Sequence, residues 1–249
     1  MLTQPLLDKL TQLRLPAFRA ALEEQLCSPH YADLSFEDRL GLLVDRECTH
    51  RGSSRLQRRL KAAGLHLPAT IEDLDLSPSR GIDRHLVLQL AQGEWIGQHL
   101  NILILGATGV GKTFLACALA HAACRHNFTV RYQRTSRLLH QTTLSHADGS
   151  YPSLLDALAR VQLLVLDDWL RDPLTRIQSQ DLLEILDDRY GRSSTTVVTQ
   201  VPVAEWHARF PDPTIADAIL DRLVHNAYRL DLRGESRRKI NSSLTMPTT

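Results

Sequence analysis

The residues best able to do chemistry lie in one glycine-rich stretch near the middle of the chain. It matches the P-loop pattern G-x-x-x-x-G-K-[ST] at all four fixed positions. Glycines let backbone N–H groups approach phosphate oxygens closely, a lysine offsets their charge, and a threonine hydroxyl can bind Mg²⁺. The stretch therefore predicts a nucleoside triphosphate site made of Gly106, Ala107, Thr108, Gly109, Val110, Gly111, Lys112 and Thr113.

Two adjacent carboxylates supply a second chemical feature. Asp167 and Asp168 directly follow the apolar run 163–166, at the predicted carboxyl end of a strand, where open α/β sheets bind their ligands. We expect Asp167 to hold Mg²⁺ together with Thr113, and Asp168 to orient or activate an attacking water. Acid pairs also serve as turn and helix-cap residues, but the upstream P-loop favours the catalytic interpretation. A carboxylate pair suits water as the nucleophile, which indicates hydrolysis.

Two further candidates come later in the chain. A strand predicted at 195–199 ends in Thr199 and Gln200, whose side chains suit contact with a γ-phosphate or its water, although a strand emerging into solvent is the alternative. Arg222 lies on an amphipathic helix before the last predicted strand, where ring-forming ATPases place an arginine finger for the neighbouring subunit. A surface ion pair with Asp217 or Asp221 is the alternative for this arginine.

Alternating strand and helix signals follow residue 100 and must position these side chains. Apolar or alternating runs predict strands, and leucines at helical spacing predict the helices between them. The strands are expected at 101–105, 129–134, 163–166, 195–199 and 227–232, and helices at 114–124 and 180–190. Strands joined by helical crossovers make a doubly wound α/β fold with a parallel sheet. About 17 residues follow the last strand, too few for a helical lid domain.

The first part of the chain has a different pattern. Leucines recur at helical spacing and prolines interrupt them, which predicts a small all-helical module. We expect an N-terminal helical DNA- or partner-binding domain at 1–70, a linker at 71–95, the nucleotide-binding core at 96–240 and a flexible tail at 241–249.

Between residues 51 and 61 the chain carries five basic residues and no acid. On a helix they form a basic face, which is an electrostatic footprint for phosphate backbones but is also common on solvated helices. The candidate DNA-binding residues are Arg51, Arg55, Arg58, Arg59 and Lys61. A second basic cluster, 237–239, could join them or belong to a simple tail.

Composition sets the outer limits. The net charge of +1 favours no partner, and 43% apolar residues are enough for a core. The four cysteines lack metal-ligand spacing, and Cys117 and Cys124 are expected to be buried thiols. An apolar run of membrane-spanning length and a secretion signal are both missing from the sequence, so we expect a cytoplasmic protein without membrane contact.

Together these motifs resemble the IstB-like ATP-binding proteins, the ATPase helpers of bacterial insertion-sequence transposition, which are related to DnaC-type helicase loaders within the AAA+ class. The resemblance covers nearly the whole chain through co-linear motifs at 13–15, 34–40, 106–121, 147–151, 166–169, 181–191, 216–225 and 234–236. It implies a five-stranded AAA+ core with strand order 5-1-4-3-2, no C-terminal lid, ATP and Mg²⁺ as cofactors, and slow hydrolysis. It also implies a homo-oligomer that assembles on duplex DNA with ATP and assists a partner transposase. The arginine-rich footprint, without an apparent groove-reading motif, predicts that this DNA binding is sequence-tolerant.

One position departs from this pattern. Leu170 stands where the family usually has glycine after Asp-Asp-Trp, which could stiffen the turn beyond the acids and change the hydrolysis rate. The runner-up function is a replicative helicase loader that acts on single-stranded DNA. The third is a P-loop phosphotransferase, which would require a small acceptor.

Overall fold

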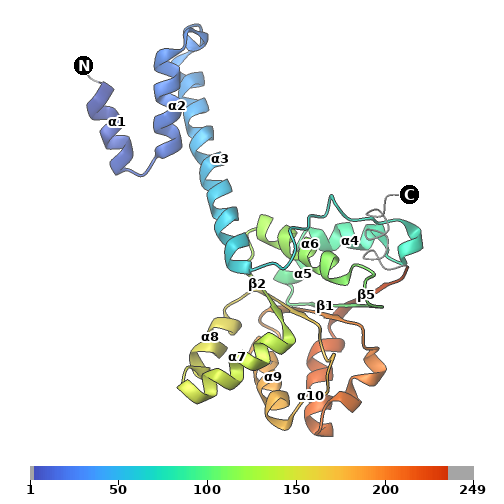
Figure 1. Ribbon diagram of the computed structural model, residues 1–249. Helices are drawn as coiled ribbons and strands as arrows, with labels where there is room; N and C mark the ends of the chain where they lie inside the picture. The colour runs from blue at the N-terminus through green and yellow to red at the C-terminus, as the bar shows by residue number, and fades with distance from the viewer. Residues whose placement is uncertain (1–2, 235–249) are drawn as a thin grey trace, which may run out of the picture. The chain divides into compact units, whose positions relative to one another are not determined.

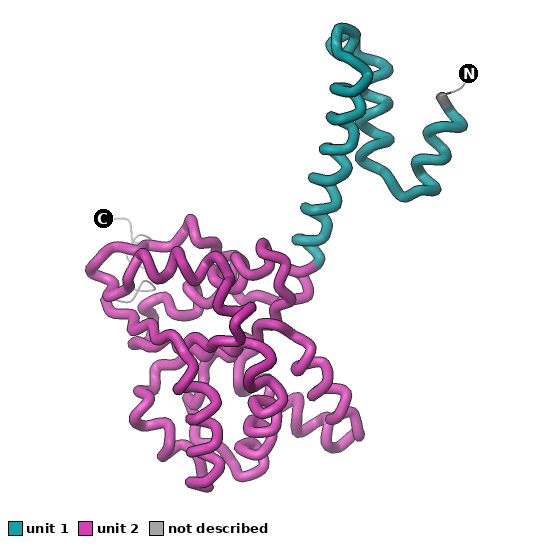
Figure 2. The backbone as a smooth tube through the Cα atoms, turned by 180° about the vertical axis from the view of Figure 1, so that it is seen from behind, with its two compact units in different colours: residues 1–58 teal, residues 59–249 magenta. Residues whose placement is uncertain are grey.

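The computed structural model describes residues 3–234, which form two compact units divided between residues 58 and 59 (Figure 2). The division falls inside a long helix, whereas the domain boundary predicted at residue 70 follows that helix. The basic cluster at 237–239 and the predicted tail at 241–249 lie outside the described residues.

The first unit is built from helices, as the leucine spacing predicts. They are α1 (Thr3–Gln12), α2 (Pro16–Cys27) and α3 (Phe36–Ala63), with a 3₁₀ turn at Pro29–Tyr31. Proline occupies the first position of α2, where its missing N–H costs nothing. The buried Glu47 of α3 accepts hydrogen bonds from the N–H groups of Ala17 and Phe18, both at 3.0 Å. This carboxylate thereby satisfies free donors at the start of α2.

The second unit alternates strands and helices. Its strands are β1 (Asn101–Gly106), β2 (Val130–Arg134), β3 (Leu163–Asp167), β4 (Ser194–Thr199) and β5 (Ala227–Leu232). Its helices are α4 (Arg84–Ala91), α5 (Glu94–Gly97), α6 (Lys112–Arg125), α7 (Thr135–Asp148), α8 (Tyr151–Ala159), α9 (Arg176–Arg189) and α10 (Pro213–Val224), with short 3₁₀ turns at Pro78–Arg80, Val203–Glu205 and His207–Arg209.

The five strands form one parallel sheet with the order β2-β3-β4-β1-β5. This confirms the predicted order 5-1-4-3-2, read from the other edge. The alternating sequence of β2 is explained by its edge position, because an edge strand is less completely covered than β3 or β4.

Helices cover both faces of the sheet: α4, α5 and α6 lie on one side and α7 to α10 on the other (Figure 1). Side chains of β1 therefore point alternately into two separate cores. Leu103 and Leu105 join the cluster packed against α7 to α10, while Ile102 and Ile104 are equally buried on the opposite face. Burial on both faces explains why this strand reads as an unbroken apolar run.

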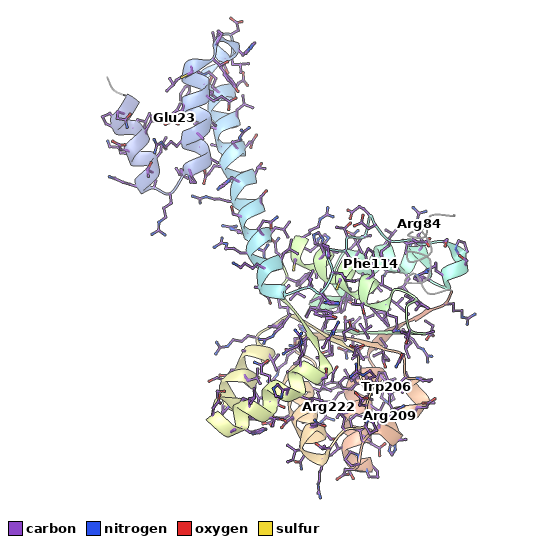
Figure 3. The ribbon with its side chains drawn as sticks, viewed as in Figure 1. Glu23, Arg84, Phe114, Trp206, Arg209 and Arg222 are labelled. Atoms are coloured by element: carbon purple, nitrogen blue, oxygen red, sulfur yellow. The ribbon has the colours of Figure 1, made fainter. Side chains whose placement is uncertain are left out.

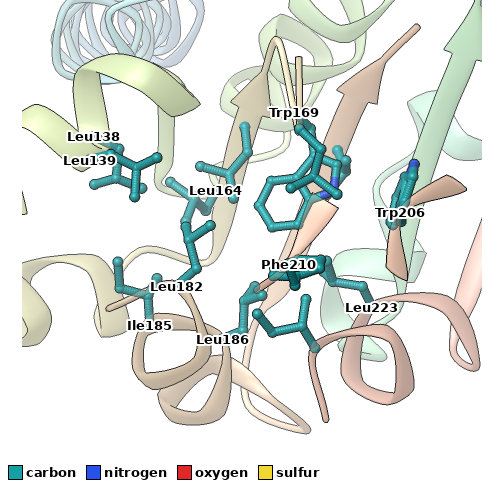
Figure 4. Packing of buried hydrophobic residues seen from close by; sticks show 14 of the residues in the cluster. Leu138, Leu139, Leu164, Trp169, Leu182, Ile185, Leu186, Trp206, Phe210 and Leu223 are labelled. Carbon is teal, nitrogen blue, oxygen red and sulfur yellow. The ribbon is translucent and has the colours of Figure 1, made fainter. Parts of the chain in front are cut away.

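The larger core contains two tryptophans, Trp169 and Trp206, whose rings meet edge to face with centroids 5.9 Å apart (Figure 4). The Trp206 indole N–H donates to the carbonyl of Val201 at 2.9 Å, which fixes the loop after β4. Trp169 directly follows the acid pair. Its burial therefore anchors the turn that carries Asp168.

Arg189, a buried residue at the end of α9, links the end of α8 to the start of β4. The Arg189 guanidinium donates to the carbonyls of Leu158 and Val161, at 2.6 and 2.8 Å, and to the hydroxyl of Thr195 at 3.1 Å. Burial lowers the pKa of Arg189 to about 10.

The two cysteines of α6 are buried, as predicted, and burial raises the pKa of both thiols, that of Cys124 to about 11. Within residues 3–234, the helices are all too short or too polar to cross a membrane.

Candidate nucleotide-binding site

The P-loop connects the end of β1 to the first residue of α6, as its pattern requires. Gly106 has φ +146°, and a Cβ atom there would lie 2.5 Å from the carbonyl oxygen of Leu232 in β5. Gly111 has φ +98° and caps α6. Only glycine suits these two positions, and the N–H groups at the start of α6 are directed toward the loop.

Lys112 and Thr108 hold the loop in shape. The Lys112 ammonium donates to the carbonyls of Gly106 and Ala107, both at 2.8 Å. The Thr108 hydroxyl donates to the side-chain oxygen of Gln200, which follows β4. The loop is therefore tied to the strand end that the sequence singled out as a γ-phosphate contact.

Asp167 is the centre of a polar network at the carboxyl end of β3. It is 4% exposed, and it accepts hydrogen bonds from the Thr113 hydroxyl at 2.8 Å and the Tyr132 hydroxyl at 2.5 Å. Burial and the bond to Asp167 raise the pKa of Tyr132, so Tyr132 stays a donor. Hydroxyl and carboxylate oxygens side by side at a phosphate loop are the donor set that Mg²⁺ prefers, so the residues fit this ion.

Asp168 lines the same cavity as Asp167 but is far more exposed. Its side chain is 41% exposed, and its backbone N–H donates to the Asp167 carboxylate at 2.8 Å. The Nε atom of Arg134, at the end of β2, lies 3.9 Å from its carboxylate. Asp168 is therefore the acid of the pair that reaches the open side of the site.

Thr199 and Gln200, for which the sequence predicts the same phosphate contact, have different surroundings in the structure. The Thr199 side chain is buried, and its hydroxyl donates to the carbonyl of Trp169 at 2.7 Å and accepts from the N–H of Val201 at 3.0 Å. These bonds fix the turn after Asp168 to the end of β4. Gln200 is exposed and bonds the P-loop, so it is the member of the pair whose side chain reaches the phosphate-binding loop.

A cavity of about 590 Å³ brings the predicted residues together, a volume within the usual range for small-molecule sites. The P-loop, both acids and the end of β4 line it, together with side chains that the motifs did not reveal. These additional residues are Leu67, Phe114, Arg134, Trp169, Arg171 and Val198.

Arg222 lies away from this cavity. The backbone carbonyl of Arg222 accepts a hydrogen bond from the side chain of Asn101, the first residue of β1. The P-loop follows the last residue of this strand, so Arg222 and the P-loop lie at opposite ends of β1. Figure 3 shows Arg222 on the other side of the sheet from Phe114 of α6. Its guanidinium pairs with Asp187 of α9 and donates to the carbonyl of Ala218 at 2.8 Å.

The alternative prediction for Arg222, a surface ion pair with Asp217 or Asp221, was wrong about the partner, which is Asp187. Asp217 and Asp221 lie 3.4 and 3.6 Å from His207 and His225 instead. The sequence could not reveal Asp187, because it is distant along the chain and approaches only through the packing of α9 against α10.

The predicted basic face lies on α3. Arg55, Arg58 and Lys61 are exposed and Arg59 is half-buried. Arg51 is already engaged, because it bonds the Glu47 carboxylate at 2.8 Å and the carbonyl of Arg14 at 3.0 Å. The other four predicted cations lie between residues 55 and 61, toward the end of α3.

Comparison with known proteins identifies the family. The model of the IstB-like ATP-binding proteins matches residues 8–245. The chain belongs to this family. An insertion sequence ATP-binding protein of Sinorhizobium fredii is 48% identical over 239 residues, covering 96% of this chain and 98% of its own. The ATP-binding protein of insertion sequence IS1162 from Pseudomonas fluorescens is 46% identical, covering 86% and 95%. The crystal structure of DnaI has the same fold, with a TM-score of 0.58, 20% identity and coverage of 71% of this chain and 94% of that one.

Membership of this family makes the chain an ATP-binding protein. Leu170, where the chain departs from the family pattern, has an unusual backbone conformation. This residue has φ +51°, a left-handed conformation that favours glycine, and its side chain is 1% exposed. The turn thus keeps the backbone conformation natural to glycine while carrying a buried leucine. Asp168, two residues earlier, also has a positive φ of +55°.

Several residues of this IstB-like site belong to no sequence motif described above. Arg80, in the predicted linker, is 9% exposed and donates to the P-loop carbonyl of Val110. Tyr132 and Arg134 could have been found, because they alternate on a predicted strand whose end adjoins the acids. Arg80 carried no signal, since its short turn at Pro78–Arg80 follows no periodic pattern.

Proposed function

We propose that this protein is an ATPase that binds duplex DNA and assists a partner transposase. The observation that carries the proposal is the 2.8 Å contact between Thr113 of the P-loop and Asp167 of β3, which joins the predicted phosphate and metal ligands in one cavity. It is supported by the relatives, which are named as ATP-binding proteins of insertion sequences.

Hydrolysis is supported by the difference between the two acids. Asp167 is buried and receives three hydrogen bonds, which fix its carboxylate beside the Thr113 hydroxyl, where the two side chains would hold Mg²⁺. When bound, the ion would offset phosphate charge. Asp168 is exposed toward the cavity, where it can accept a proton from water. Lys112 would bind the β- and γ-phosphates, and Gln200 would orient the water.

Binding to duplex DNA is supported by the exposed arginines and the lysine at the end of α3. Contacts of this type neutralise phosphates and carry little sequence information, so we propose sequence-tolerant binding.

Assembly into a homo-oligomer is supported by the position of Arg222, which cannot reach its own cavity and would complete that of a neighbour. The proposed location is the cytoplasm, where DNA and ATP are both present.

A helicase loader is the second candidate, favoured by the structural likeness to the DnaC helicase loader, with a TM-score of 0.51 and 18% identity. The two functions differ in their DNA, because a loader acts on single strands. A phosphotransferase is a weaker third candidate. Such an enzyme has to exclude water from its acceptor substrate, whereas Asp168 lines this cavity and is 41% exposed to solvent.

The experiment that separates these functions is a DNA-binding titration. Fluorescently labelled duplex and single-stranded oligonucleotides of equal length are titrated with the full-length protein, with ATP or with ADP, and binding is followed by anisotropy. We expect tighter binding to the duplex, and tighter still in ATP. Preference for the single strand would favour the loader, and the absence of binding to both would refute the DNA-binding proposal.

A further inference from the structure

The segment that follows the basic helix α3 is packed directly on the nucleotide site. Helix α3 ends at Ala63, and the next residues lie against α6, the helix that begins in the P-loop. Ala63 and Ala69 are 1% and 0% exposed, and Leu65 and Leu67 pack around Cys117. The last turn of the predicted DNA-binding helix, which belongs to the second unit, is therefore held against α6 by buried contacts of the segment that follows it.

One side chain of this segment, His66, contacts the end of β2. Its ring is nearly parallel to that of Tyr132, with centroids 6.1 Å apart and planes 11° apart. Its Nε2 atom lies 3.1 Å from a terminal nitrogen of Arg134. Since an arginine can only donate, the histidine nitrogen is the acceptor.

The two residues that His66 contacts are those that contact the acid pair. Tyr132 donates to Asp167, and Arg134 lies beside Asp168. They are two positions apart on β2, so both side chains project from the same face of the strand. The His66 ring, just after α3, therefore contacts both Tyr132, which bonds the predicted metal ligand, and Arg134, which lies beside the predicted base.

We infer that His66 is a positioning residue that couples the DNA-bound state of α3 to Asp168 by accepting a hydrogen bond from Arg134. This rests on the proposed function, since it requires that DNA binds α3 and that Asp168 acts in hydrolysis. A small displacement of the end of α3 moves His66, which moves the guanidinium beside Asp168. The physical link is the hydrogen bond rather than the ring stack, because only the bond restrains the guanidinium.

Two substitutions separate the hydrogen bond from the stack. His66→Phe keeps a ring against Tyr132 and removes the acceptor, whereas His66→Gln loses the ring and keeps an acceptor at similar reach. His66 is exposed, so both variants should fold. His85→Phe, on the exposed side of α4, is the matched control for replacing a histidine by phenylalanine.

The measurement is the ratio of ATP hydrolysis rates with and without saturating duplex DNA, for the full-length protein. We expect stimulation in the wild type, in His66→Gln and in His85→Phe, and a ratio close to one in His66→Phe. ATP affinity and thermal midpoint should be equal in all four proteins. A merely structural role would predict the reverse order, with His66→Gln impaired more than His66→Phe.

A double substitution tests whether the effect passes through Arg134. If it does, adding His66→Phe to Arg134→Gln changes the ratio no further, whereas independent effects would multiply within about twofold. Normal stimulation of His66→Phe, beside a stimulated wild type, overturns this inference and leaves the proposed function standing. A wild type that hydrolyses ATP but does not respond to bound DNA contradicts the inference alone. Failure of the wild type to hydrolyse ATP or bind DNA contradicts the proposed function as well.

Discussion

Replacing Leu170 tests whether the turn after the acid pair has the backbone conformation described above. In the middle of a helix or strand, glycine is less stabilising than alanine by about 0.5–1 kcal/mol, because it loses more backbone entropy on folding. At φ +51° an L-residue costs about 1–2 kcal/mol, and glycine avoids this cost. We therefore expect the order to invert, with Leu170→Gly more stable than Leu170→Ala.

The magnitudes follow from burial and conformation. Both variants lose a leucine side chain that is 1% exposed in the larger core, and such losses cost about 2–5 kcal/mol. Leu170→Ala keeps the left-handed strain and bears the full cost. Leu170→Gly is relieved of the left-handed strain, about 1–2 kcal/mol, but has the entropic penalty of glycine, about 0.5–1 kcal/mol. We therefore expect it to be more stable than Leu170→Ala by about 1 kcal/mol.

The assay is urea denaturation followed by tryptophan fluorescence, since the buried Trp169 adjoins the substituted residue. Leu182, fully buried in α9 within the same core, provides the control. There Leu182→Gly should be less stable than Leu182→Ala by about 1 kcal/mol, the usual helical order. If position 170 shows the same order as position 182, the left-handed turn is refuted.

Three further predictions concern the site and its partners. Asp168→Asn should bind Mg²⁺ and ATP normally but hydrolyse ATP about 10²–10⁴-fold more slowly, because an amide cannot accept the proton; equal turnover in a phosphate-release assay would move the base elsewhere. A triple variant with alanine at Arg55, Arg58 and Arg59 should show a weaker salt dependence of binding to duplex DNA. The slope of log affinity against log salt should decrease in magnitude by up to about three, and an unchanged slope would show that these side chains do not meet phosphates. Mixing Arg222→Ala with Lys112→Ala should restore part of a hydrolysis rate that each has lost alone, since a finger in trans is worth about 10³–10⁵; mixed assemblies without activity would exclude Arg222.

The sheet was predictable because its strands carry strong local signals. β3 and β4 are buried on both faces, so each must be continuously apolar or β-branched, and the P-loop fixes where β1 ends. The expected strand at 163–166 differs from β3 by one residue, and the difference is Asp167 itself. The acid is both the last residue of the strand and the first of the site.

Contacts between distant segments were not predictable in the same way. Arg80 reaches the P-loop across 30 residues, and Arg222 reaches Asp187 across 35, and neither pair has a spacing that a local pattern could show. The role of Thr199 was also hidden. Its type suited a phosphate contact, but only the fold reveals that its hydroxyl bonds the backbone of Trp169 and Val201.

The central claim is that the loop from Gly106 to Thr113 forms an ATP site with Lys112 as its cation, and calorimetric titration with Mg·ATP tests it most directly. Lys112 contributes charge-assisted hydrogen bonds worth about 1.5–3 kcal/mol, so Lys112→Ala should bind ATP at least about tenfold more weakly than the wild type. Unchanged affinity in a folded Lys112→Ala protein would contradict the account.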